Sequence, residues 1–142
     1  MQLTRHTDFS LRVLIFLSLQ DNNSLVTIDD VAAHFNVLKN HLTKVVHQLA
    51  KHGYVKTVRG KHGGICLAQL PASICLSEII QAMEANIEVI NCREPACPLV
   101  DHCELKGILN EAQHAFFTTL EKYTLADIAR QPQEIKTLLN WS

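Results

Sequence analysis

Three cysteines stand close together in the second half of the sequence: Cys92, Cys97 and Cys103. Thiolates are soft ligands, and both zinc and iron–sulfur clusters are bound by them. Three thiols do not complete a four-ligand site, so another residue must supply the last donor. The gaps of four and five residues are wider than structural zinc usually takes, and they favour the larger iron–sulfur cluster. A zinc site that includes His102 and a group of free thiols are the alternatives.

The other residues that could do chemistry do not indicate catalysis or export. The five cysteines cannot all pair, and no signal-peptide pattern is recognised, so we expect a reducing, cytoplasmic setting. Cys66 and Cys75 fall in a strand and an apolar stretch and are interpreted as core residues. No motif places a cysteine beside a base, and no Gly-rich loop opens a helix. No apolar run is long enough for a membrane span, so we expect neither an enzyme nor a membrane protein.

A second group of residues is basic. Residues 31–77 contain six lysines and arginines, five of the eight histidines and no aspartate or glutamate, although the chain's net charge is −1. A merely solvated basic face would mix charges of both signs. A stretch of 47 residues without a carboxylate is instead typical of a surface that binds a polyanion. The histidines of this segment, His34 among them, are expected on the surface or at phosphates.

The elements predicted around this segment place its bases on a helix and a hairpin. In order, they are a helix over 8–20, a short helix over Ile28–His34, a helix over Leu38–Lys51, a strand over 54–58 and a strand from Ile65. Thr27 and Asp30 form the capping pattern of the short helix, Asn36 suits the turn after it, and Gly53 ends the next helix. This order predicts a winged helix-turn-helix.

In that fold the second helix enters the major groove of DNA, and the hairpin, or wing, suits the minor groove. Polar residues stand on the side of the Leu38–Lys51 helix that is opposite its apolar face. The residues expected to contact DNA are Thr27, Lys39, Asn40, His41, Thr43, Lys44, Arg59, Lys61, His62 and Gly63. The expected partner is therefore a double-stranded operator.

The second half is predicted to be helical on both sides of the cysteine loop. A helix capped by Ser77 is expected to run to about Glu88, and apolar spacing predicts a long helix over 104–123. A separate amphipathic helix suits a dimer seam, because a duplex operator favours two-fold symmetry. The alternative is that this helix folds back on its own domain. Patterns at Thr124 and Pro132 predict two short final helices.

The predicted fold class is mainly α with a small β-wing. Residues 1–76 are assigned to a winged helix-turn-helix DNA-binding region. Residues 77–142 are assigned to the cysteine loop and the dimerisation helices, within one compact chain that forms an intertwined dimer.

Several stretches spread over nearly the whole chain form a recognisable set. They are Met1-Gln2-Leu3-Thr4, Thr7-Asp8, Leu11-Arg12, Asn40-His41-Leu42, Gly53-Tyr54-Val55, Val58–Ile65, the three loop cysteines and Tyr123–Asp127. The Arg-Gly-x-x-Gly-Gly wing together with the cysteine spacing is the most specific combination. The set resembles the iron–sulfur winged-helix repressors, and within that family its nitric-oxide-sensing members.

The resemblance implies a homodimeric, DNA-binding repressor that senses nitric oxide. It implies that Cys92, Cys97 and Cys103 hold a [4Fe–4S] cluster, with Asp8 of the partner subunit as the fourth ligand. Arg12 stands one helical turn beyond Asp8 and would orient its carboxylate. The alternative for Asp8 is an acid that is favoured at a helix N-terminus.

Some positions depart from the family pattern. Leu38 replaces a small polar helix cap, so the recognition helix is expected to begin with a weaker cap. Asn36 stands where glycine is common and still suits the turn. The family's [2Fe–2S] branch uses a histidine after the third cysteine, where this chain has Lys106. A [2Fe–2S] cluster stays the alternative, and a preparation made in air can lack the cluster.

Overall fold

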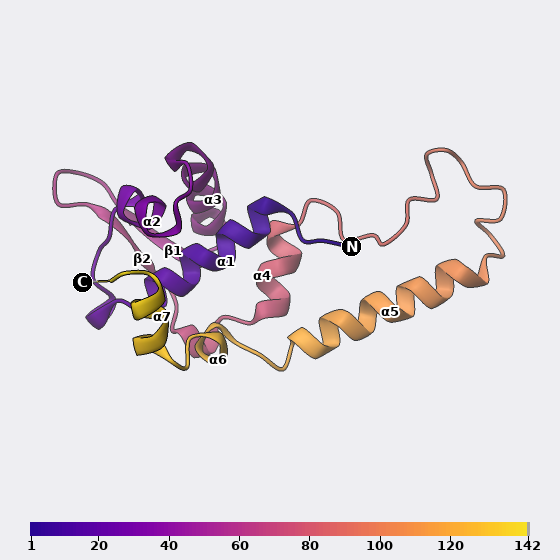
Figure 1. The fold of residues 1–142 in the computed structure, drawn as a ribbon. Helices are drawn as coiled ribbons and strands as arrows, with labels where there is room; N and C mark the ends of the chain where they lie inside the picture. Colours follow the sequence, from indigo (N-terminus) through magenta and orange to yellow (C-terminus); the bar gives the residue numbers. More distant parts are fainter. Residues whose placement is uncertain (142) are drawn as a thin grey trace.

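The computed structural model describes residues 1–141 as a mainly helical chain with a two-stranded sheet. Its elements are α1 (Arg5–Ser18), η1 (Asp21–Asn23), α2 (Ile28–Phe35), α3 (Lys39–Lys51), β1 (Val55–Val58), β2 (Gly64–Leu67), η2 (Pro71–Ser73), α4 (Leu76–Met83), α5 (Glu104–Leu120), α6 (Leu125–Ile128) and α7 (Pro132–Leu138). Most elements form a body, from which α5 extends (Figure 1). The predicted fold class, mainly α with a small β-wing, is confirmed.

The first helix, α1, lies at the centre of the body. The Thr4 side chain accepts a hydrogen bond from the backbone N–H of Thr7 and so caps the helix. Apolar residues at helical spacing face inward, and Val13 and Phe16 are almost completely buried. They pack against α3, α4, α6 and β2. Because Leu125 belongs to the same core, residues from both sides of position 76 share it.

The helix-turn-helix begins with the predicted capping box. The Thr27 hydroxyl accepts a hydrogen bond from Asp30 N, and the Asp30 carboxylate accepts one from Thr27 N. Hydrogen bonds from Thr27 lower the pKa of Asp30 below its ordinary value. Asn36 has a φ of 51°, the left-handed conformation predicted for the turn. Leu38 makes no side-chain hydrogen bond at the start of α3, so the expected weak cap is confirmed.

The strands β1 and β2 form an antiparallel hairpin, which is the predicted wing. The register pairs Val58 with Gly64 next to the tip. Gly63 is required there, because a Cβ at this position would lie 2.1 Å from the carbonyl oxygen of Val58. A bridge between Ile65 and Val26 joins the hairpin to the segment before α2. The wing is therefore attached to the helix-turn-helix.

The helix after the wing, α4, differs from the prediction at both ends. It begins at Leu76 without a side-chain cap, and Ser77 is buried in its first turn. It ends at Met83, well before Glu88. The chain leaves the helix at Glu84, whose backbone is extended and whose carboxylate binds the start of α1. A contact with a distant segment, which sequence spacing does not reveal, accompanies this early end.

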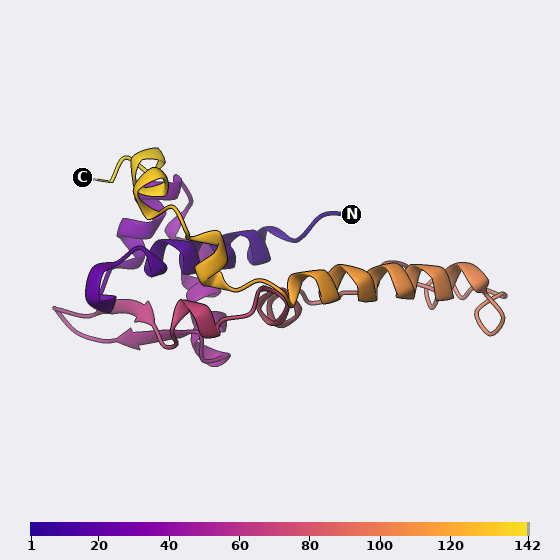
Figure 2. The same ribbon diagram turned by 90° about the horizontal axis from the view of Figure 1, so that it is seen from below.

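The last three helices take two different courses. None of the residues of α5 is buried, and the helix extends away from the body in both views (Figures 1 and 2). The chain then returns: α6 begins with the predicted capping box of Thr124 and Asp127, and Pro132 begins α7 as predicted. Within residues 1–141, no helix combines the length and apolarity that a membrane crossing requires.

Two side chains are placed differently from the prediction. His34 is not a free surface residue, because its ring lies 5.0 Å from that of Phe16 and 5.3 Å from that of Trp141, between ring centroids. The return of α7 to the body brings Trp141 to this position. Cys75 is half-buried rather than a core residue, because it stands at the N-cap of α4 and not on the buried face of that helix. Cys66 is buried, as predicted.

Candidate DNA interface and metal-binding loop

The outer face of α3 carries the residues predicted to contact the major groove. Lys39, Asn40, His41, Thr43 and Lys44 are all exposed, whereas the four buried residues of the helix are apolar. Lys39 Nζ lies 2.6 Å from a carboxylate oxygen of Asp29, so this lysine is tied to α2. The Thr43 hydroxyl donates to the Lys39 carbonyl oxygen at 3.0 Å. The helix presents a polar, basic face to solvent, as a recognition helix does.

The wing presents the second group of predicted DNA contacts. Arg59, Lys61 and His62 are exposed at its tip, with Gly63 beside them. Among residues 1–141, no carboxylate lies within ion-pair distance of Arg59 or Lys61. An arginine without an ion partner is suited to the negative potential of a narrow minor groove. The Thr27 hydroxyl is already used in the capping box, and its contact with DNA stays a prediction.

Asp8 and Arg12 form a two-point contact one helical turn apart on α1. Arg12 Nε donates to Asp8 Oδ1 at 3.0 Å, and Arg12 Nη2 lies 2.9 Å from Asp8 Oδ2. Arg12 therefore contacts both oxygens of the carboxylate. The cap of α1 is Thr4 and not Asp8. Asp8 nevertheless lies in the first turn of α1, where an acid is favoured, so this alternative and the role of metal ligand both stay open as predictions.

Aromatic contacts continue from this ion pair to the recognition helix. The guanidinium carbon of Arg12 lies 5.7 Å from the ring centroid of Phe9 and 5.9 Å from that of Phe35. The Phe9 ring stacks on His41 of α3, with centroids 6.1 Å apart and an interplanar angle of 18°. Phe9 falls within the helix predicted over 8–20, but no sequence motif singles it out. The sequence around Phe9 does not indicate its contact with His41, because that contact forms only when α1 packs on α3.

The three loop cysteines lie in the segment that leads into α5. Each is half-buried, and Cys103 directly precedes the helix. The backbone N–H of Cys97 donates to the carbonyl oxygen of Cys92 at 3.1 Å, so the segment between them forms a turn. Their thiols are donors of the kind that iron–sulfur clusters require. Within residues 1–141, however, no three His, Cys, Asp or Glu side chains are grouped closely enough to hold a metal ion.

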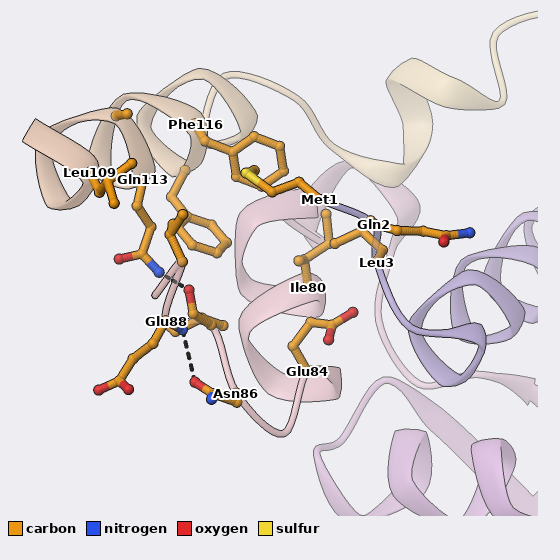
Figure 3. A pocket seen from close by; sticks show the side chains of 14 residues that line it. Met1, Gln2, Leu3, Ile80, Glu84, Asn86, Glu88, Leu109, Gln113 and Phe116 are labelled. Atoms are coloured by element: carbon orange, nitrogen blue, oxygen red, sulfur yellow. Dashed lines mark hydrogen bonds between the residues drawn. The ribbon is translucent and has the colours of Figure 1, made fainter. Parts of the chain in front are cut away.

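An open apolar groove lies between the N-terminal residues, α4 and α5 (Figure 3). Its volume is about 570 Å³, and its lining includes Met1, Leu3, Ile80, Leu109 and Phe116. The N-terminal residues, α4 and α5 are far apart in the sequence, so the groove depends on the tertiary fold. It was not predicted from the sequence.

A hydrogen-bonded carboxylate stands at the edge of this groove. Glu84 Oε1 accepts hydrogen bonds from Thr4 N at 2.7 Å and from Thr4 Oγ1 at 3.1 Å. Burial by itself would raise the pKa of Glu84, but hydrogen bonds from Thr7 and Thr4 lower it below its ordinary value. The end of α4 is thus joined to the cap of α1, one turn from Asp8.

Comparison with known proteins identifies the family. Residues 3–131 match the Rrf2 family, which is described as "Iron-dependent Transcriptional regulator". The chain belongs to the Rrf2 family. Its resemblance to iron–sulfur winged-helix repressors, noted from the sequence, is confirmed. An Rrf2 protein with this fold is a DNA-binding transcriptional regulator and not an enzyme.

Curated relatives of this Rrf2 chain match it along nearly its full length. It is 43% identical to the HTH-type transcriptional regulator NsrR of Bacillus licheniformis, over 99% of this chain and 100% of that protein. It is 39% identical to the HTH-type transcriptional regulator NsrR of Bacillus subtilis, over 98% of this chain and 97% of that protein. The chain is therefore similar in both sequence and extent to regulators named NsrR.

Solved structures show the same fold as this Rrf2 chain at lower sequence identity. CymR, described as the global cysteine regulator of B. subtilis, has a TM-score of 0.73 and 23% identity, over 92% of this chain and 97% of that chain. T. potens IscR has a TM-score of 0.76 and 20% identity, over 96% of this chain and 91% of that chain. These similarities support the winged-helix fold.

Proposed function

We propose that this Rrf2 regulator is a homodimeric repressor that holds an iron–sulfur cluster and releases its operator on exposure to nitric oxide. The observation that carries the proposal is the separation of its metal donors. The cysteine loop lies at the end of α5 that points away from the body (Figures 1 and 2), whereas Asp8, held by Arg12, belongs to α1 within the body. A second copy of the chain can supply the Asp8 that its own loop lacks. The NsrR name of the curated relatives supports the same function.

The uncovered face of α5 supports the homodimer. Leu105, Ile108 and Phe116 are 55%, 61% and 39% exposed, and Phe116 also lines the apolar groove. A second copy on this face would remove a large apolar area from water, which is the main driving force for association. A two-fold dimer presents two recognition helices and two wings to the half-sites of a palindromic operator. A repressor that acts on operator DNA would work in the cytoplasm.

The proposed donor set consists of Cys92, Cys97, Cys103 and the partner's Asp8. When bound, a [4Fe–4S] cluster would supply iron sites that react with nitric oxide. A carboxylate is a harder and weaker ligand for such a site than a thiolate, so the corner held by Asp8 would be the labile one. Arg12 contacts both oxygens of Asp8, so it sets the orientation in which the carboxylate is offered.

The contacts of α1 support a connection between this donor set and DNA. Arg12 lies against Phe9, and Phe9 stacks on His41 of the recognition helix. A change at Asp8 would therefore reach α3 through side chains in direct contact. When the donor set is broken, α1 of one protomer and the cysteine loop of the other lose their shared anchor. The position of α3 then no longer depends on the partner, and the operator is bound less tightly.

The proposed DNA contacts follow the two exposed basic surfaces. On α3 they are Lys39, Asn40, His41, Thr43 and Lys44, which would face the major groove. On the wing they are Arg59, Lys61, His62 and Gly63, with Arg59 in the minor groove. Thr27, at the start of α2, would contact the phosphate backbone of the DNA. The affinity of these basic side chains for DNA should depend strongly on salt concentration, because each contact with a phosphate releases counterions.

The test uses the full chain purified without oxygen. We expect a coloured protein that contains iron and sulfide, and we expect nitric oxide to lower its affinity for a duplex selected from a random-sequence library. Alanine at Cys92, Cys97 or Cys103 should each abolish the colour, whereas Cys66→Ala is the matched control and should keep it. A colourless protein that contains zinc would contradict the proposal. Full colour in any of the three loop variants would show that the ligands are wrong.

A further inference from the structure

The residue that precedes the recognition helix contributes little to the fold. Leu38 is the N-cap of α3, and α3 begins without a side-chain hydrogen bond. Serine, threonine, asparagine or aspartate at this position would accept a hydrogen bond from the first turn, which a leucine cannot do. The Leu38 side chain is also 70% exposed, so the core does not bury it. The Leu38 carbonyl oxygen accepts a hydrogen bond from His41 N at 3.0 Å, but its side chain stabilises neither the helix nor the core of this chain.

The surroundings of Leu38 favour DNA as the partner that covers it. The exposed residues that follow it include Asn40 and Lys44, and residues 31–77 contain no carboxylate; the adjacent Lys39 is paired with Asp29 of α2. Protein partners usually bury an apolar core of aromatic and aliphatic residues at an interface and avoid lysine there. Leu38 is instead a single leucine on a basic, polar face. The partner expected from this pattern is a polyanion that offers one small apolar group.

Thymine in duplex DNA has such a group. The C5-methyl group of thymine lies in the major groove, where the N-terminal residues of a recognition helix reach the base edges. We propose that Leu38 contacts the C5-methyl group of a thymine in each operator half-site, and that this contact makes the regulator select thymine there. The inference rests on the proposed recognition of DNA by α3. It assigns a specificity role to a residue whose side chain does not cap its helix.

The experiment removes the methyl group from the DNA and the leucine from the protein. The full chain, purified without oxygen, selects a duplex from a random-sequence library. Each thymine of that duplex is then replaced by deoxyuridine, symmetrically in both half-sites, which removes only the methyl group. At one position, wild-type affinity should fall about 4-fold per half-site, the factor that corresponds to about 0.8 kcal/mol for one buried methylene-sized group. Leu38→Ala should bind the unmodified duplex at least as weakly as the wild type binds the duplex with deoxyuridine at that position. The affinity of Leu38→Ala should not fall further when that thymine is replaced.

Two further variants control for folding and for general surface effects. Leu70 is 74% exposed but lies outside α3, so Leu70→Ala should keep wild-type affinity and the wild-type response to deoxyuridine. Leu38→Ser can cap α3, so it should unfold at no lower temperature than the wild type and still lose the thymine response. Equal losses in the wild type and Leu38→Ala at every thymine, or no loss at any thymine, would overturn the proposal. Failure of the wild type to select any duplex would overturn both this inference and the proposed DNA recognition.

Discussion

Replacing Asp8 with alanine distinguishes a carboxylate that stabilises a helix from one that binds a metal. The Asp8–Arg12 pair is exposed, with 46% of the aspartate and 41% of the arginine side chain accessible. An exposed pair at this spacing contributes about 0.3–0.5 kcal/mol to stability, and an acid in the first helical turn contributes roughly 0.3–1 kcal/mol. Thr4 supplies the cap, so no larger loss is expected. Asp8→Ala should lower the free energy of unfolding by only about 1 kcal/mol.

The effect on the cluster-loaded protein should be much larger. The cluster can survive on three thiolates with an outside fourth ligand, but the link between the loop and the α1 helix of the partner would be lost. We expect operator affinity to fall at least about 10-fold, which is about 1.4 kcal/mol, and to change little with nitric oxide. The assay measures the affinity of loaded wild type and Asp8→Ala for one duplex, before and after nitric oxide.

A matched control removes another acid from an exposed ion pair. Asp21 lies 4.0 Å from Lys136 Nζ and is 92% exposed, so Asp21→Ala makes the same change in charge at a place far from the metal donors. This variant should match the wild type in affinity and in its response to nitric oxide. If loaded Asp8→Ala also matches the wild type in both, Asp8 is a helix acid and not a ligand, and the reasoning is refuted.

Three further predictions concern the wing and the start of α1. Arg59→Ala should weaken operator binding by about 1–3 kcal/mol and reduce the salt slope by about one phosphate contact, whereas Lys51→Ala, at the far end of α3, should not; salt titrations of affinity decide this. Gly63→Ala should lower the unfolding temperature, because the new Cβ would lie 2.1 Å from the Val58 carbonyl oxygen, whereas Lys61→Ala at the same tip should leave it unchanged in thermal unfolding. Glu84→Gln tests a pH-dependent contact: because folding lowers the pKa of Glu84, its stabilisation is present above its ordinary pKa and is lost as the pH falls through the lowered one. The unfolding temperatures of the wild type and Glu84→Gln should therefore differ most at neutral pH and converge as the pH falls through the lowered pKa of Glu84, and a constant difference would contradict this role.

Features that depend on neighbours in the sequence could be predicted. The capping boxes at Thr27 and Thr124 each join residues three positions apart, and Asn36 takes its turn conformation locally. Helical periodicity likewise predicted α1, α3 and α5, because a stripe of apolar residues repeats with the pitch of the helix whether or not it is buried. The acid-free segment 31–77 predicted a basic surface, since charge is a property of composition.

Features that join distant residues could not be predicted in this way. The early end of α4 accompanies the Glu84–Thr4 contact, and His34 is covered by the returning C-terminal segment. The stack of Phe9 on His41 exists only because α1 packs on α3. Spacing along the chain does not measure such distances, so the sequence alone does not reveal that Phe9 contacts His41.

Part of the candidate metal site could be predicted from the sequence, and part depends on the tertiary structure. The types and spacing of Cys92, Cys97 and Cys103 are sufficient to identify soft metal donors, because ligand chemistry belongs to the side chain. Only the tertiary structure shows that α5 carries their loop away from Asp8, and that Arg12 holds the Asp8 carboxylate at both oxygens (Figures 1 and 2). The distance between two ligands depends on the path of the backbone between them. That path depends on which helices pack against the hydrophobic core. In this chain α1 packs in the core, whereas no residue of α5 is buried.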